Sequence, residues 1–222
     1  MTAIRAAASA GFLLTLLWAR AAAPGAPALS SAVDQQIKKR FGNKVLRIAR
    51  ATEAVLGKLT GYEVLNVDVR NPRAAIAGRS VHLHTVLVDR EQKAVFLEAS
   101  PGTVAFLHKR GLCTASTDER RGRECIELVA TLSRVRVLAS PQAAGEACKA
   151  CNRVTGLCNS KVLAAKLRPP STRCASADRC ELTFFFLADP NICLVARTTI
   201  SFAGQKPPAV RTTAVYRTGG YR

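Results

Sequence analysis

Residues 31–59, SAVDQQIKKRFGNKVLRIARATEAVLGKL, are the stretch that decides the predicted fold of this 222-residue chain. Their apolar side chains, with one threonine among them, recur every three or four residues, as on one face of an amphipathic α-helix. This stripe consists of Ile37, Phe41, Val45, Ile48, Thr52, Val55 and Leu59. It predicts a helix of roughly six to seven turns that starts with Ser31 and Asp34 as a capping pair. Gly42 and Asn43 are poor helix formers and leave a break or bend open at that point.

The opposite side of the predicted helix is basic, with Glu53 as its single acid. A cluster of cations on one face favours an anionic partner. Five of these cations are the candidate anion-binding residues: Lys38, Lys39, Lys44, Arg47 and Arg50. The composition of the chain points the same way, because 33 Lys and Arg residues against 15 Asp and Glu residues give a net charge of +18.

After the predicted helix the apolar period changes to two, which indicates β-strands. The segments with strand character are residues 62–69, 81–88, 94–97, 126–138, 162–167, 182–187, 193–202 and 210–216. One long N-terminal helix followed by antiparallel strands is an α+β pattern, in which the helix packs its stripe on the sheet. No helices separate the predicted strands, so a doubly wound parallel fold is not expected.

The first 21 residues have the pattern of a secretory signal peptide. Arg5 precedes a compact apolar run at residues 10–18, and Ala19-Arg20-Ala21 provides a cleavage site between small residues. The run is about half as long as a bilayer-spanning helix, although an uncleaved anchor or a buried segment would have a similar composition. We therefore expect a secreted, extracellular protein with no membrane span, whose mature chain begins with a flexible Ala/Pro-rich leader at residues 22–30.

All the cysteines lie in the second half of the chain, at Cys113, Cys125, Cys148, Cys151, Cys158, Cys174, Cys180 and Cys193. An even number in a secreted protein indicates up to four disulfides, and the spacing leaves their pairing open. The CxxC pair at residues 148–151 would also suit half of a zinc site or a redox centre. However, no second such pair follows at the spacing of a zinc ribbon, and an Ala/Gly-rich loop is not a typical redox setting. Structural disulfides are the interpretation that we favour.

The cysteine distribution also predicts the organisation of the chain. A region of helix plus antiparallel strands would cover residues 31–112, a cysteine-rich β region residues 113–202, and a basic tail residues 203–222. The boundary separates either two domains or the core and the disulfide-linked half of one domain.

The charge excess narrows the class of partner. Because Arg5 and Arg20 fall in the signal peptide, the mature chain would keep a charge of about +16. For an extracellular protein, this favours an anionic polysaccharide or an acidic protein surface, and a protein receptor or a protease is a further candidate. Charge that serves only solubility is the plain alternative. Specific nucleic-acid binding is not expected, because no binding motif is present and aromatic residues are scarce.

Nothing in the sequence has the pattern of a catalytic site. His82 and His84 lie two apart on a predicted strand and would face the same side, with His108 as a conceivable third metal ligand. Such a pair is common on sheets without a metal. There is no GxSxG, HExxH or glycine-rich phosphate loop. We therefore expect a protein that is not an enzyme and needs no metal or cofactor.

The order of the predicted elements resembles the cystatin superfamily, which includes cathelicidin pro-regions. Residues 32–36, AVDQQ, are similar to the start of the family helix, and the ending from Cys180 through Cys193 is similar to that of cathelicidin-type members. The family loop QxVxG is approached by residues 74–78. The resemblance implies an α+β fold and a loop that blocks cysteine proteases, formed here by Ala74, Ala75, Ile76, Ala77 and Gly78. Ala74 stands where the family has glutamine, and the family's tryptophan hairpin is missing because the only tryptophan is Trp18.

The second half carries another resemblance. Residues 146–151, EACKAC, and 157–160, LCNS, are similar to the opening of netrin-type domains, as in meteorin-like proteins. Both families are secreted, disulfide-bonded and mostly non-enzymatic. The sequence therefore predicts a secreted, cystatin-like binding protein for anionic partners. A cystatin-type inhibitor of cysteine proteases and a netrin-type regulatory protein are the alternatives.

Overall fold

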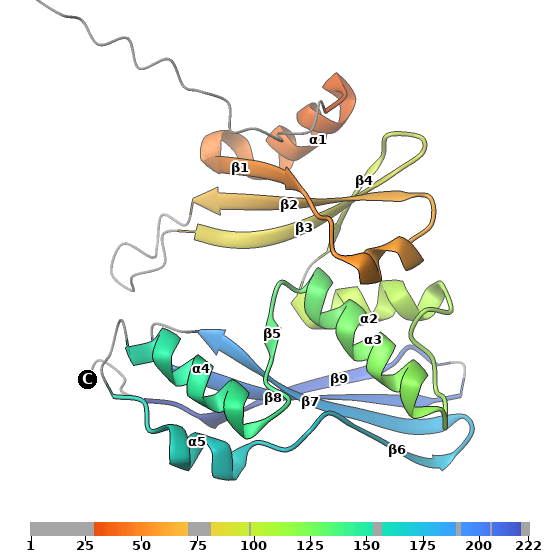
Figure 1. Ribbon diagram of the computed structural model, residues 1–222. Helices are drawn as coiled ribbons and strands as arrows, with labels where there is room; N and C mark the ends of the chain where they lie inside the picture. The colour runs from red at the N-terminus through yellow and green to blue at the C-terminus, as the bar shows by residue number, and fades with distance from the viewer. Residues whose placement is uncertain are drawn as a thin grey trace, which may run out of the picture.

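The computed structural model describes residues 29–70, 81–97, 99–152, 157–189, 192–204 and 206–218. Within these residues the chain forms two antiparallel sheets, which are separated by helices α2 and α3 (Figure 1). The predicted class, a mixture of helices and antiparallel strands with several disulfides, is confirmed. The single long N-terminal helix is not, because the described residues contain five α-helices and nine strands.

The predicted helix over residues 31–59 stops after three turns. Helix α1 covers Ser31–Phe41, and the hydroxyl of Ser30 caps it by accepting a hydrogen bond from the Val33 amide at 3.3 Å. Gly42 ends the helix with a φ of +61°, which glycine adopts without the strain that a side chain would bring. The chain continues as a short 3-10 turn, η1 (Gly42–Lys44), then strand β1 (Val45–Arg50), and then a second 3-10 turn, η2 (Ala54–Lys58).

A β-bulge explains why strand β1 imitates a helical pattern. The pairing of β1 with its neighbour shifts register between Val45 and Arg47. One extra residue in the bulge lets Val45 and Ile48, three positions apart, pack in the same cluster as Ile37 of α1. A spacing of three is therefore produced here by an irregular strand and not by a helical turn.

The first sheet has the strand order β1-β2-β3-β4, with β2 at Tyr62–Arg70, β3 at Val81–Asp89 and β4 at Ala94–Leu97. These three strands confirm the predictions made for residues 62–69, 81–88 and 94–97. One face of the sheet packs on α1, through Val67 and Val86 against Val33 and Ile37. The other face packs against α2 (Ala99–Lys109) and α3 (Glu119–Leu132).

The second sheet has the order β5-β7-β8-β9, with β6 also paired to β7. Its strands are β5 (Arg136–Val137), β6 (Ser171–Ser176), β7 (Arg179–Asp189), β8 (Leu194–Ala203) and β9 (Ala209–Tyr216). Alternate residues of β7 serve two clusters: Phe184 faces α2 and α3, whereas Phe185 packs with α4 (Pro141–Asn152) and α5 (Ser160–Lys166).

The strands predicted at residues 126–138 and 162–167 are wrong, because these segments are largely helical. In α3, Ile126 and Val129 lie three positions apart on one buried face, and the Asp118 carboxylate caps the helix by accepting from the Arg120 amide at 2.8 Å. Asn159 caps α5 in the same way, with its side-chain oxygen 3.1 Å from the Val162 amide. Both caps are the short polar residues that favour helix starts.

One hydrophobic cluster continues from the first sheet through α2 and α3 to the second sheet. It contains Val64 and Leu87 on one side, Val104 and Val129 in the middle, and Phe184 on the other side. An ion pair also joins the two sheet regions, with Arg134 Nη1 2.6 Å from Asp68 Oδ1. The halves of the chain that differ in cysteine content therefore share a core.

The predicted disulfides are confirmed. The pairs are Cys113–Cys125, Cys148–Cys158, Cys151–Cys193 and Cys174–Cys180. The first closes the connection between α2 and α3, the last bridges the β6–β7 hairpin, and the other two fasten α4 to later parts of the chain. No helix in the described part of the chain is long and apolar enough to span a bilayer. The predicted signal peptide lies outside the described residues.

Candidate functional site

The five predicted anion-binding residues do not share a helix face, because α1 ends at Phe41. Lys38 and Lys39 lie in the last turn of α1, Lys44 lies in η1, and Arg47 and Arg50 lie on β1. We call these five residues the cationic strip. β1 is an edge strand of the first sheet, so the strip runs from the end of α1 along a sheet edge.

Two members of the strip form ion pairs with acidic residues. Lys38 Nζ lies 2.6 Å from Asp34, and Arg50 Nε lies 2.7 Å from Glu63. The other three, Lys39, Lys44 and Arg47, are exposed and have no ion-pair partner among the described residues.

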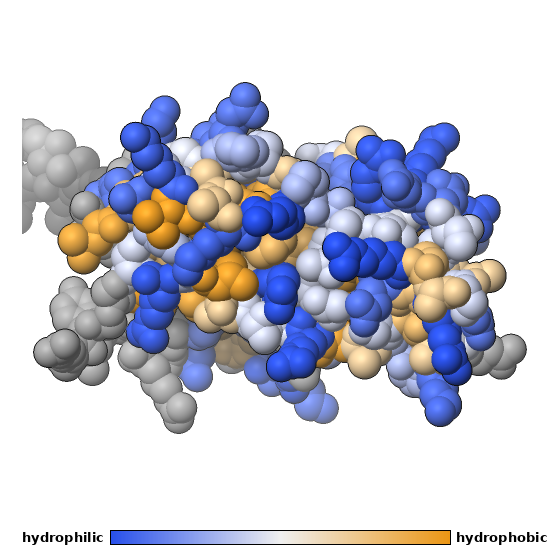
Figure 2. Space-filling view, turned by 90° about the horizontal axis from the view of Figure 1, so that it is seen from below, coloured by the Kyte–Doolittle hydropathy of each residue, from blue (hydrophilic) through white to orange (hydrophobic). Residues whose placement is uncertain are grey.

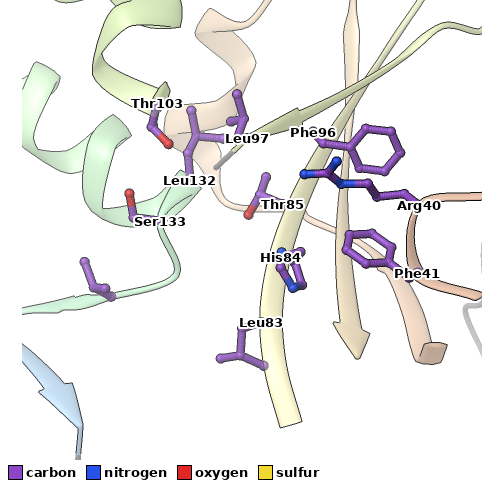
Figure 3. A pocket seen from close by; sticks show the side chains of 11 residues that line it. Arg40, Phe41, Leu83, His84, Thr85, Phe96, Leu97, Thr103, Leu132 and Ser133 are labelled. Atoms are coloured by element: carbon purple, nitrogen blue, oxygen red, sulfur yellow. The ribbon is translucent and has the colours of Figure 1, made fainter. Parts of the chain in front are cut away.

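A cavity of about 470 Å³ opens beside β3, at the point where β4 stops (Figure 3). Leu97, the last residue of β4, pairs with Thr85. Among the described residues, β3 positions 81–84 pair only with β2, so this part of the β3 edge is open. The cavity extends to both faces of the sheet around this edge, because its lining includes successive residues of β3, such as His84 and Thr85.

One side of the cavity is aromatic and basic. The rings of Phe41 and His84 are 4.6 Å apart, and those of Phe41 and Phe96 are 5.6 Å apart with edge-to-face geometry. The guanidinium of Arg40 points between the two phenylalanine rings toward β3 (Figure 3). This side therefore combines flat apolar surfaces with one positive charge.

The other side of the cavity carries hydroxyl groups. Those of Thr85, Thr103 and Ser133 face a common space (Figure 3). Among the described residues, Thr85 Oγ1 and Ser133 Oγ are the buried side-chain polar atoms that have no hydrogen-bond partner. Thr85 is only 3 % exposed. A buried hydroxyl without a partner is costly, so two of them in one cavity are the strongest sign of a ligand or ordered water in this part of the molecule.

The three histidines do not form one site. The rings of His82 and His84 lie 6.2 Å apart on β3, as their spacing predicts. His108 lies near the end of α2, where its Nδ1 is 3.1 Å from the Cys113 carbonyl oxygen and its ring is near Phe202. No group of three metal-binding side chains that includes a histidine occurs in the described ranges.

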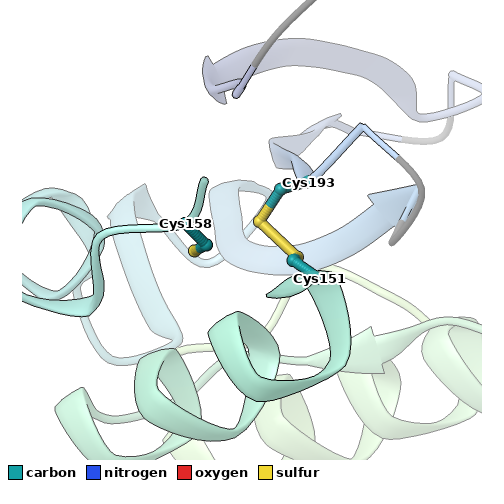
Figure 4. A group of neighbouring side chains, drawn as sticks. All are labelled: Cys151, Cys158 and Cys193. Carbon is teal, nitrogen blue, oxygen red and sulfur yellow. A yellow bond between two sulfur atoms is a disulfide. The ribbon is translucent and has the colours of Figure 1, made fainter. Parts of the chain in front are cut away.

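One group of cysteines does have the proximity of a metal site. The sulfur atoms of Cys151, Cys158 and Cys193 lie within 4.8 Å of one another (Figure 4). All three are in disulfides, Cys158 with Cys148 and Cys151 with Cys193. Because the thiolate is the form that binds a metal, the group does not fit a metal ion in this oxidised state.

The face that carries α5 and β6, at the bottom of Figure 1, is mostly hydrophilic. On the side seen from below in Figure 2, hydrophilic side chains project between smaller apolar areas. In the described ranges, four large hydrophobic residues are exposed: Leu46, Leu83, Leu157 and Val162. Leu83, at 45 % exposure, lines the cavity. The predicted inhibitory loop, Ala74 to Gly78, lies outside the described residues.

Among the described residues, two carboxylates outside the cavity have a lowered pKa, Glu124 and Asp178, and a hydrogen bond from the Ser176 hydroxyl is the main cause at Asp178. A hydrogen bond from Lys58, at 2.5 Å in the ion pair, lowers the pKa of Glu124 below its ordinary 4.5, with a smaller contribution from Arg120. The pair joins η2 to α3 at the surface and lies in no cavity described here. It therefore has a structural explanation and does not indicate acid–base chemistry.

Known proteins provide no further guide. No protein-family model matches the sequence, and no curated protein or solved structure is similar enough to count as a match. The cystatin-like and netrin-like resemblances therefore stay predictions.

Proposed function

We propose that the protein is a secreted, non-enzymatic binding protein that engages anionic extracellular partners through the cationic strip. Glycosaminoglycans are the partner class that this proposal favours, and acidic protein surfaces are the second. The packing of α1 across a four-stranded antiparallel sheet supports a cystatin-like arrangement for the first half. The netrin-type alternative rests on the sequence of residues 146–160 alone.

The observation that carries the proposal is the set of three exposed cations without acidic partners, Lys39, Lys44 and Arg47. They fall within a short segment at the end of α1 and the start of β1. A single exposed ion pair is worth only about 0.2–1 kcal/mol. A linear polyanion gains more, because it contacts several of these cations in one binding event. The net charge of about +16 expected for the mature chain adds long-range attraction.

Charge at this place also has a purely structural use. Lysine and arginine on an edge strand discourage other strands from pairing with it. Edge protection and polyanion binding differ in one respect, because cations that only protect the edge need no polyanion as a partner. A comparison of variants with equal charge therefore separates a local binding surface from a general effect of charge.

The experiment is elution of the full chain from a heparin column in a salt gradient. The strip variant carries Lys39→Gln, Lys44→Gln and Arg47→Gln. A control triple variant removes the same charge from exposed positions elsewhere, with Lys149→Gln, Lys161→Gln and Arg211→Gln. We expect the wild type to elute at high salt, the strip variant at clearly lower salt, and the control close to the wild type. Equal shifts of both variants, or wild-type elution near that of a neutral protein, would overturn the proposal.

The cystatin-type inhibitor alternative depends on residues 74–78. A lack of inhibition of papain-class proteases at micromolar protein would exclude it.

A further inference from the structure

Three of the cysteine sulfur atoms lie close enough to exchange bonds. The Sγ atoms of Cys151, Cys158 and Cys193 are within 4.8 Å of one another (Figure 4). Two of them, in Cys151 and Cys193, share a disulfide, whereas Cys158 is bonded to Cys148. In the described ranges no other group of three cysteines has this proximity. A sulfur atom of one disulfide therefore lies beside a second disulfide.

These two disulfides differ in their access to solvent. A thiolate opens a disulfide only when it can reach one of the two sulfur atoms. Cys151 and Cys193 are 0 % exposed and Cys148 is 3 % exposed, whereas Cys158 is partly exposed. An external reductant therefore enters this group of sulfur atoms at Cys158, and the Cys151–Cys193 disulfide is closed to it while the fold is intact.

Hydrogen bonds hold Cys158 in place independently of its own disulfide. Its amide donates to the side-chain oxygen of Asn152 at 2.6 Å, and its carbonyl oxygen accepts from Asn152 Nδ2 at 3.3 Å. Asn152 is the last residue of α4 and directly follows Cys151. The next residue, Asn159, donates its amide to the Tyr216 hydroxyl at 2.9 Å. These bonds keep Cys158 beside the buried disulfide after its own disulfide has been reduced.

We propose that these sulfur atoms form a thiol–disulfide exchange site in which Cys158 is the nucleophile. An external dithiol reductant first donates two electrons to the Cys148–Cys158 disulfide, is itself oxidised to a disulfide, and leaves two thiols on the protein. The thiolate of Cys158 then attacks one sulfur atom of the Cys151–Cys193 disulfide. A new S–S bond to that sulfur forms, the Cys151–Cys193 bond breaks, and the other sulfur leaves as a thiolate that takes up the proton lost by Cys158.

The exchange changes what fastens α4 to the second sheet. In the oxidised protein the Cys151–Cys193 disulfide links the end of α4 to the residue before β8. Attack by Cys158 at either sulfur atom removes this direct link, because Cys158 takes the place of one of the two partners. A reductant that touches only the surface thus opens a fully buried disulfide. The site is distinct from the cationic strip and does not depend on polyanion binding.

The test is stepwise reduction of the full chain, with free thiols labelled by N-ethylmaleimide in denaturant and located by peptide mass spectrometry. A limiting amount of a phosphine reductant is added first at about pH 5, where few thiols are ionised, and the label should appear on Cys148 and Cys158. The pH is then raised to about 8, which increases the thiolate fraction of a cysteine with a pKa of about 8.5 roughly several hundredfold. The label should now move from Cys158 to Cys151 or Cys193, and peptides in which Cys158 is linked to the other of these two residues should appear.

Cys148→Ser provides the same test without a reductant, because it leaves Cys158 as a thiol, and its label should be shared between Cys158 and the two buried cysteines. The control is Cys180→Ser, which leaves a thiol at Cys174, outside the group of close sulfur atoms, and its label should stay there. The stepwise reduction needs no variant, so it decides the question if Cys148→Ser does not fold. The proposal is overturned if Cys158 keeps all of its label after the pH is raised or in the folded Cys148→Ser variant. It is equally overturned if the control thiol spreads over other cysteines as readily.

Discussion

Replacement of Thr85 by valine is expected to stabilise the protein, although it removes a polar group from the middle of strand β3. Thr85 is 3 % exposed, and its hydroxyl has no hydrogen-bond partner in the described structure. Burial of such a hydroxyl costs about 1–3 kcal/mol relative to an apolar group of the same shape. Valine is also β-branched and suits a strand equally well. We therefore expect the free energy of unfolding to rise by about 1 kcal/mol.

Thr198 provides the matched control. It is a threonine on a central strand, 0 % exposed, but its hydroxyl lies 2.8 Å from the hydroxyl of Thr212. Thr198→Val removes this hydrogen bond, so the free energy of unfolding should fall by roughly 0.5–1.5 kcal/mol. The same substitution is thus expected to have opposite signs at two buried positions.

Urea denaturation followed by circular dichroism measures both changes, and comparable m-values would indicate that the unfolded states are similar. In thermal unfolding, 1 kcal/mol corresponds to about 2–4 °C for a chain of this size. If Thr85→Val destabilises as much as Thr198→Val, then the Thr85 hydroxyl is hydrogen-bonded in solution, for example to water that fills the cavity. That result would refute the reasoning that this hydroxyl is unsatisfied.

Three further predictions concern the framework. Gly122→Ala should lower the free energy of unfolding by about 1–3 kcal/mol in denaturant melts, because a Cβ on α3 would collide with the Thr172 side chain of β6. Gly145→Ala on α4 meets no atom within 4 Å and should raise the free energy of unfolding by up to about 1 kcal/mol, and similar effects of the two substitutions would contradict this packing. Loss of the Cys151–Cys193 disulfide, which links residues 42 positions apart, should lower the free energy of unfolding by about 4 kcal/mol. Loss of the Cys174–Cys180 disulfide, with a separation of 6, should lower it by about 2 kcal/mol, and the reverse order would argue against the loop-entropy explanation. The pKa of Glu124, measured by NMR titration, should lie below 4.5 because of the ion pair with Lys58 at the end of η2. The ion pair therefore stabilises the fold above the unfolded-state pKa of Glu124, and this contribution is lost as the pH falls through the lowered folded-state pKa. An unshifted pKa would mean that the ion pair does not persist in solution.

The strands of the first sheet could be predicted from the sequence because their pattern is regular. β2 and β3 alternate between two faces, and both faces have recognisable apolar residues, such as Val67 on one and Leu87 on the other. β1 could not be predicted, because the bulge between Val45 and Arg47 removes the alternation. Local spacing alone cannot distinguish a bulged strand from a helical turn.

The helices of the second half were missed for a different reason. Segment 141–152, PQAAGEACKACN, suggested a loop because of its small residues, yet alanine is the strongest helix former and the segment forms α4. Cys148 and Cys151 lie on its buried face. Their three-residue spacing, which had suggested a metal or redox motif, instead places both on the helix side that faces the core.

The cationic strip and the cavity also differ in how far they could be predicted from the sequence. The cationic residues are exposed, as lysine and arginine usually are, but their predicted arrangement on one helix face was wrong because α1 ends at Phe41. The cavity could not be predicted at all. Arg40, Thr85 and Ser133 are distant in sequence, and they meet only because α1 packs on one face of the first sheet while α2 and α3 pack on its other face.

The shared hydrophobic cluster has a consequence for the order of folding. The first sheet leaves the ribosome before α3 and β7, so the face that carries Val64 and Leu87 stays uncovered until Phe184 and its neighbours have been made. Contacts of such long sequence separation form slowly, and an apolar face that stays exposed until they form promotes aggregation. We therefore expect the N-terminal half to need the cysteine-rich half to cover this face, and expression of the N-terminal half alone should yield insoluble material.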